Sequence, residues 1–115
     1  MAYPAPSLAF VERFDALRQR YAQSLPFKAA EIATLWRSLE ESPDSPTVDA
    51  LQQAVHRLSG SAPAYGYEAI GAAAQWLDLQ LSEWLSSPAD ERQPVDALRQ
   101  SLSLGVRSLF SAFTV

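Results

Sequence analysis

His56 is the only histidine in this chain of 115 residues, and its side chain is the best suited to chemistry. An unperturbed imidazole is largely neutral at pH 7, so its free ring nitrogen is a nucleophile that needs no special activation. Polar side chains stand three or four residues away, which are adjacent positions on a helix. These polar neighbours are Gln52, Gln53 and Ser59, and Gly60 is also adjacent, four residues after His56. We therefore predict one site, centred on His56, in a small and polar setting.

The helix expected to carry His56 has an apolar stripe with the helical spacing of three and four residues. That stripe consists of Val48, Leu51, Val55, Leu58 and Ala62. At 100° per residue, His56 points more than a right angle away from the centre of the stripe, so it should face water or a partner. Gly60 weakens a helix by about 1 kcal/mol relative to alanine, and we expect it to clear space beside the imidazole. Gly66 should end the helix in a left-handed conformation.

Composition excludes several classes of protein. The chain has no cysteine, which excludes disulfides, thiolate catalysis and the usual structural zinc sites, and one histidine cannot build a metal cluster. A net charge of −4 argues against a nucleic-acid partner. No apolar run is long enough to span a bilayer, and the first seven residues do not look like a signal peptide. We expect a cytoplasmic protein with no membrane contact.

Prolines divide the sequence into five expected helical segments, and no strand is predicted because no useful alternation of apolar and polar residues occurs. The segments run from Ser7 to Ser24, from Pro26 to Glu41, from a cap at Ser45 or Thr47 to the turn at Gly66, from Tyr67 to Ser86, and from Asp90 to Phe113. In the first segment, Phe10, Phe14, Leu17 and Tyr21 should line the inward side. The expected fold is all-α, an antiparallel up-and-down four-helix bundle with an additional N-terminal helix, forming a single domain over residues 1–115. Leu79 and Leu104 lie outside the main apolar stripes, so they are either ordinary surface residues or part of a contact surface.

The stretch from Ala54 to Gly66 resembles the signature of histidine-containing phosphotransfer domains, the carriers between receiver domains in multistep two-component signalling. The resemblance lies in His56, Gly60 and Gly66, and in the small or apolar residues Ala54, Leu58, Ser61 and Ala62. Members of that family usually have lysine three residues after the histidine, where this chain has Ser59. A hydroxyl donates a hydrogen bond but brings no positive charge, so the transferring phosphoryl group should be stabilised less.

The resemblance implies that His56 takes a phosphoryl group from the aspartyl phosphate of a response-regulator receiver domain and passes it to another receiver. The domain would then be a phosphoryl carrier without kinase activity, and a hybrid sensor histidine kinase is a further candidate partner. No cofactor is expected on this chain, because in the family the receiver contributes the magnesium ion. Gln52, Gln53 and Ser59 would orient the imidazole or the phosphoryl oxygens, Gly60 would give clearance, and Arg57, Pro63 and Tyr67 would contact the partner. Pro63 also removes a helix hydrogen bond and should end its helix early.

Two other functions are open at this point. A bundle that has lost phosphotransfer and only binds a protein partner is supported by Ser59, and its binding would survive loss of the imidazole. A cofactor-binding bundle that uses His56 with Met1 or another ligand is disfavoured, because a single outward-facing histidine is a poor cofactor site.

Overall fold

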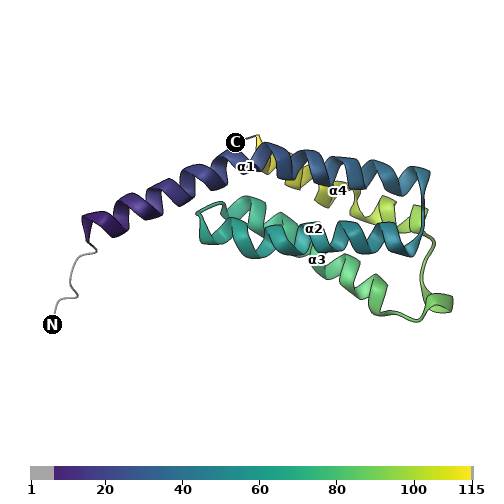
Figure 1. The fold of residues 1–115 in the computed structure, drawn as a ribbon. Helices are drawn as coiled ribbons and strands as arrows, with labels where there is room; N and C mark the ends of the chain where they lie inside the picture. Colours follow the sequence, from purple (N-terminus) through teal and green to yellow (C-terminus); the bar gives the residue numbers. More distant parts are fainter. Residues whose placement is uncertain (1–6, 115) are drawn as a thin grey trace.

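A computed structural model describes residues 7–114, and over this range the chain is helical with no strand. The elements are α1 (Leu8–Glu41), α2 (Ser45–Ala64), α3 (Glu68–Ser86), the short 3₁₀ helix η1 (Ala89–Glu91) and α4 (Val95–Phe113). Successive helices run up and down side by side, joined by short connections (Figure 1). The all-α bundle is therefore confirmed. No helix in this part of the chain combines the length and apolar character needed to cross a membrane.

The prediction of an additional N-terminal helix was wrong, because α1 is one helix of 34 residues that contains Pro26. Proline removes one helix hydrogen bond and its ring crowds the preceding turn, which usually kinks rather than ends a well-packed helix. Here the buried side of α1 continues across Pro26, from Tyr21 to Ile32. The Ser24 hydroxyl also donates a 2.6 Å hydrogen bond to the Tyr21 carbonyl, one turn before the break. Packing and this local bond hold the two halves together as one helix.

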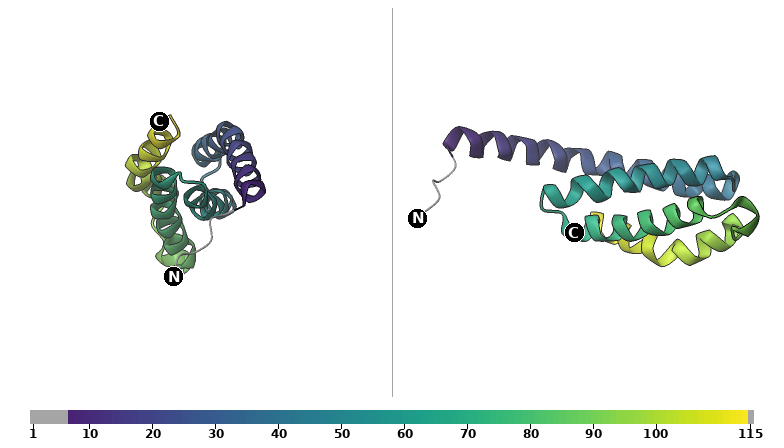
Figure 2. Two further views of the ribbon diagram at one scale, coloured as in Figure 1. Left: turned by 90° about the vertical axis from the view of Figure 1, so that its left-hand side faces the viewer. Right: turned by 90° about the horizontal axis from the view of Figure 1, so that it is seen from below.

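The N-terminal part of α1, residues 8–20, projects beyond the bundle, and we call it the arm (Figures 1 and 2). Phe10, Phe14 and Leu17 were predicted to point inward, but they are 56%, 42% and 46% exposed because no other element covers this side of the arm. Tyr21, at the base of the arm, is the one member of that predicted stripe that is buried. The radius of gyration is 17.2 Å, against about 13 Å for a compact domain of this length.

The core lies between α2, α3 and α4 and the C-terminal half of α1, with the most extensive packing between α2 and α3. The α2 stripe is buried as predicted, and α3 and α4 also bury apolar stripes, which include Leu77 and Leu81 on α3 and Leu98 and Leu102 on α4. Between α2 and α3 the backbones approach closely where the Pro63 ring lies against Gly71. A Cβ atom at Gly71 would overlap that ring, so the close approach depends on glycine. Leu79 and Leu104 are exposed, at 60% and 71%.

The starts of two helices differ from the prediction. Asp44, and not Ser45 or Thr47, caps α2, because its carboxylate accepts a 2.9 Å hydrogen bond from the Thr47 amide. The last helix begins at Val95 rather than at Asp90, because residues 89–91 form η1 and Pro94 follows. At the other end of α2 the helix stops one residue after Pro63. Gly66 then has a φ of 89°, which confirms its left-handed conformation.

Candidate functional site

His56 lies on the exposed ridge of α2, with its side chain 68% exposed, as the spacing predicted. Its Nδ1 atom is 2.8 Å from the Oδ2 atom of Asp78 on α3. The imidazole is therefore tethered at one nitrogen to the neighbouring helix. Among the described residues, Nε2 has no hydrogen-bond partner, so the second nitrogen is free to react.

Asp78 is the centre of a small polar network between α2 and α3, and its side chain is only 15% exposed. Its Oδ1 atom accepts hydrogen bonds from Gln52 Nε2 at 2.8 Å and from Ser82 Oγ at 3.2 Å. Partial burial alone would raise the pKa of the Asp78 carboxyl. The hydrogen bonds from His56, Gln52 and Ser82, together with the charge that His56 carries when protonated, outweigh this and hold the pKa below its ordinary value.

The ionised state of Asp78 fixes the tautomer of His56. A carboxylate can only accept hydrogen bonds, so the proton of the 2.8 Å contact must be on Nδ1 of His56. A neutral imidazole with its proton on Nδ1 carries its lone pair on Nε2. The arrangement thus presents a nucleophilic nitrogen to solvent on the side of the ring away from α3.

The other residues predicted to support a phosphoryl group do not all surround the imidazole. Gln52 acts on it through Asp78. Gln53 points to Asp49 instead, with Nε2 2.6 Å from a carboxylate oxygen. The Ser59 hydroxyl donates to the backbone carbonyl of His56 at 2.7 Å. A Cβ atom added at Gly60 would meet nothing within 4 Å, so the space on this side is open, as expected of a clearance residue.

The three predicted partner-contact residues lie in three different settings. Arg57 is exposed and forms a 3.0 Å ion pair with Glu31 on α1. The Pro63 ring packs against α3, next to Gly71. Tyr67 is half-buried at the start of α3 and packs against Tyr21, with ring centroids 5.8 Å apart. Of the three, only Arg57 adjoins His56.

Sequence reasoning missed Asp78, although the sequence contains a signal for it. Between Glu68 and Glu83, Asp78 is the only charged residue, and it follows directly after the buried Leu77. A lone carboxylate at the edge of an apolar stripe needs a partner, because a partly buried charge is costly when unpaired. The position of the partner could not be found without knowing how α2 and α3 align.

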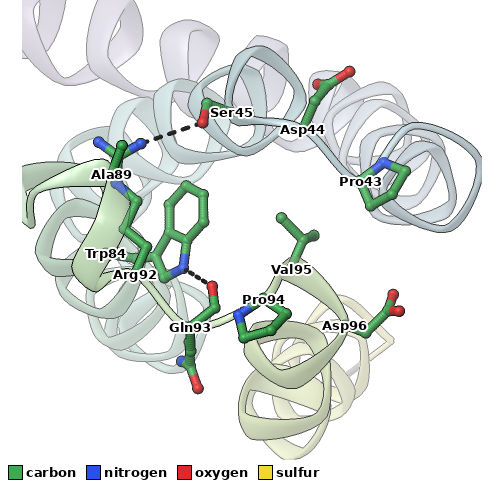
Figure 3. A pocket seen from close by; sticks show the side chains of 10 residues that line it. All are labelled: Pro43, Asp44, Ser45, Trp84, Ala89, Arg92, Gln93, Pro94, Val95 and Asp96. Carbon is green, nitrogen blue, oxygen red and sulfur yellow. Dashed lines mark hydrogen bonds between the residues drawn. The ribbon is translucent and has the colours of Figure 1, made fainter.

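A cavity of about 540 Å³ lies at the opposite end of the bundle from the arm (Figure 1), and Figure 3 shows the residues that line it. Its main polar group, Arg92, donates to Ser45 Oγ and to the backbone carbonyls of Leu85 and Ser87. Trp84 lies under the guanidinium group and donates to the Gln93 carbonyl at 2.9 Å. These contacts join the start of α2 and the end of α3 to the segment that precedes α4, which is a structural task. His56 is about 16 Å along α2 from Ser45, so this cavity is not part of the histidine site.

No group of three potential metal ligands occurs within residues 7–114. His56 contacts the charged side chain of Asp78, and Arg57, the next residue in the chain, is engaged with Glu31. The arrangement is thus one exposed imidazole, oriented by a carboxylate on the next helix, with open space over Gly60. Such a group can accept and release a small electrophile at Nε2.

Comparison with known proteins identifies the family of this chain. The family model described as "Hpt domain" matches residues 10–104, which is most of the sequence and includes α2, α3 and the histidine. Neither a curated protein nor a solved structure matches the chain. The helical bundle agrees with this family, whose members carry phosphoryl groups on histidine in phosphorelays. The chain belongs to the Hpt domain family.

Proposed function

We propose that His56 is the phosphoryl-carrying residue and that this domain relays a phosphoryl group between response-regulator receiver domains. The observation that supports the proposal most is the contact between Nδ1 of His56 and the carboxylate of Asp78. It orients an exposed ring and leaves the Nε2 lone pair available.

The transfer requires no activation of His56 by a base. The Nε2 lone pair attacks the phosphorus of the receiver's aspartyl phosphate and forms the N–P bond. The bond between phosphorus and the aspartate oxygen breaks, and its electrons return to the receiver's carboxylate. The carboxylate of a second receiver then attacks the same phosphorus, the N–P bond breaks, and its electrons return to Nε2.

Asp78 would act as a positioning residue in both directions. When Nε2 carries the phosphoryl group, the imidazole ring is cationic, with a proton on Nδ1. The carboxylate 2.8 Å from Nδ1 accepts that proton's hydrogen bond and offsets the charge. Gln52 and Ser82 hold the other carboxylate oxygen, so Asp78 cannot turn away from the ring without losing two bonds.

The rest of the transfer machinery would come from the partner. Magnesium, bound in the acidic pocket of the receiver, would balance the charge of the phosphoryl oxygens during transfer. This chain would supply only the nucleophile and its orientation, and therefore acts as a carrier rather than a kinase.

The test is phosphorylation by purified receiver domains that have been charged with acetyl phosphate. Acid-labile, base-stable phosphate should form on the wild-type chain and not on His56→Gln. Far-UV circular dichroism of both proteins controls for folding, and His56 is exposed enough for the variant to fold. Failure of the wild type to take up label from receivers that bind it would contradict the proposal.

One observation favours the alternative of a bundle that only binds a partner. The Ser59 hydroxyl, which replaces the usual lysine, is engaged with the His56 carbonyl. Arg57, the nearest basic side chain along α2, is paired with Glu31. An interaction module predicts that His56→Gln binds the receivers as tightly as the wild type and that neither protein is labelled.

A further inference from the structure

The arm presents an apolar face with no partner among the described residues. Its largest apolar side chains, Leu8, Phe10, Val11, Phe14 and Leu17, are between 42% and 74% exposed. The rings of Phe10 and Phe14 stack with centroids 6.4 Å apart, so they form one continuous surface. Exposed apolar patches of this kind generally mark a binding surface.

This face continues the buried side of α1. Phe14, Tyr21, Ile32 and Leu39 lie on one side of the helix, and the last three are buried in the bundle. α2 ends at Ala64, so the arm continues the same apolar stripe past the end of its partner helix (Figure 1). An unsupported helix of about 13 residues is marginal in water, so the arm needs a second element along it.

The base of the arm has room for an aromatic side chain. A hollow of about 290 Å³ lies there, lined by Asp15, Arg18, Gln19, Ala22 and Tyr67. Beside it, Tyr21 stacks on Tyr65 with ring centroids 4.5 Å apart. The hollow thus combines the Tyr67 ring and the Arg18 guanidinium group, against which a phenyl ring can pack, with the polar side chains of Asp15 and Gln19.

We propose that two copies of this chain associate through their arms, with the arms antiparallel and the apolar faces together. The arm is about 20 Å long, so a two-fold axis near its middle places the tip of each arm at the base of the other. Phe10 of each copy then reaches the hollow beside Tyr67 of the other, and Phe14 lies opposite Leu17. The same stripe serves both copies, because a two-fold interface is self-complementary.

The exposed apolar area is sufficient for a weak dimer. Aromatic side chains bury about 150–250 Å² each, so the partly exposed apolar side chains of two arms supply roughly 900 Å². When the aromatic side chains at the base of each arm are included, the total buried area approaches about 1,200 Å², which is the lower limit for a specific interface. The dimer should therefore depend on concentration.

The small net charge of the arm leaves little repulsion between two copies. Three arginines and two acidic residues give residues 1–24 a net charge of +1, whereas six basic and eleven acidic residues give residues 25–115 a net charge of −5. The acidic residues of the bundle lie mainly at the end away from the arm, around Glu41, Asp44 and Asp96, so charge does not decide the contact between two arms. His56 is on the ridge of α2 and remains exposed, so this proposal does not depend on phosphotransfer.

The test is the mass of the full chain by sedimentation velocity over a wide range of concentration. We expect a monomer at low concentration, a dimer at high concentration, and a dimer dissociation constant raised about hundredfold in Phe14→Asp. Phe27→Asp is the matched control, because Phe27 is on the same helix, is 78% exposed and lies off the stripe. Since the chain has no cysteine, a mixture of Phe14→Cys and Leu17→Cys should form a disulfide between copies, and Phe27→Cys should not.

Several outcomes would overturn the proposal. A monomer at every concentration removes it, as does a dimer that Phe14→Asp leaves intact. Loss of the dimer in Leu104→Asp alone would assign the contact to the apolar groove between α3 and α4, where Trp76 and Leu104 are exposed. A monomer that sediments with phosphatidylglycerol vesicles and loses this binding in Phe14→Asp would assign the arm to a membrane surface.

Discussion

Replacing Asp78 by asparagine tests the central contact of the proposed mechanism. The substitution keeps the shape of the side chain but removes its charge and turns one oxygen into a hydrogen-bond donor. Gln52 and Ser82 both donate to one side of residue 78, so the asparagine oxygen should stay there. Its NH₂ group then faces Nδ1 of His56, which accepts a hydrogen bond only when the ring proton has moved to Nε2. The nucleophilic lone pair would be lost from the reactive nitrogen.

The size of the effect follows from the bond that is lost. A hydrogen bond to a charged group contributes about 1.5–3 kcal/mol, and the exposure of His56 places this one at the lower end. A loss of about 1.4 kcal/mol in the transition state slows a reaction about tenfold. We therefore expect phosphotransfer from a charged receiver to slow about 10-fold in Asp78→Asn, and more if the tautomer change is complete.

The assay is the initial rate of label transfer from phosphorylated receiver to this chain, with folding checked by thermal unfolding. Asp49→Asn is the matched control, because it removes the same charge from the exposed side of α2, where Asp49 contacts Gln53 and not His56. Asp49→Asn should transfer at the rate of the wild type. A folded Asp78→Asn protein that also transfers at the rate of the wild type would show that the carboxylate does not orient the imidazole.

Three further predictions concern stability, measured by urea unfolding. The pKa of Asp78 is lowered on folding from its ordinary value of 3.8, so the stabilising contribution of Asp78 is complete above that pH and is lost as the pH falls through the lower, folded pKa. The difference in free energy of unfolding between wild type and Asp78→Asn should therefore shrink in that range. A difference that stays constant with pH would contradict this prediction. Gly60→Ala should raise the free energy of unfolding by up to about 1 kcal/mol, because the added methyl group enters open space on a helix. Gly71→Ala should lower the free energy of unfolding by about 1–3 kcal/mol, because the rigid Pro63 ring cannot move aside. Equal effects of the two substitutions would refute the close packing between α2 and α3. Pro26→Ala should raise the free energy of unfolding by about 1–3 kcal/mol by restoring a helix hydrogen bond, and a decrease would show that the break is needed.

Periodicity alone was enough to predict the part of the fold that packs densely. The stripe of α2 is completely buried, and His56 is exposed where the turn angle placed it. Both follow because a helix fixes the direction of each side chain relative to its neighbours, whatever lies on the other side. The conformation of Gly66 and the open space at Gly60 were also predicted from the sequence: Gly66 has the positive φ that a helix end requires, and the space beside Gly60 is open.

Periodicity could not show which apolar stripes have a partner. Phe10, Phe14 and Leu17 have helical spacing, yet nothing in the described chain covers them. The stripe continues across Pro26, but α2 stops at Ala64, and the lengths of two helices decide where contact between them ends. Asp78 was missed for the same reason, because its contact with His56 depends on the alignment of α2 with α3.

The same alignment has a consequence for how firmly a phosphoryl group would be held. Asp78 offsets the positive ring of phosphorylated His56, but its own charge also repels the phosphoryl oxygens across the ring. At about 6 Å and the dielectric constant of water, each pair of unit charges costs about 0.7 kcal/mol. Ser59, in place of a lysine, adds no positive charge to balance this, and Arg57 is paired with Glu31. The charges of this face would therefore orient the nucleophile without trapping its product, which suits a carrier that passes the group on and leaves tight binding of the phosphoryl oxygens to the partner's metal ion.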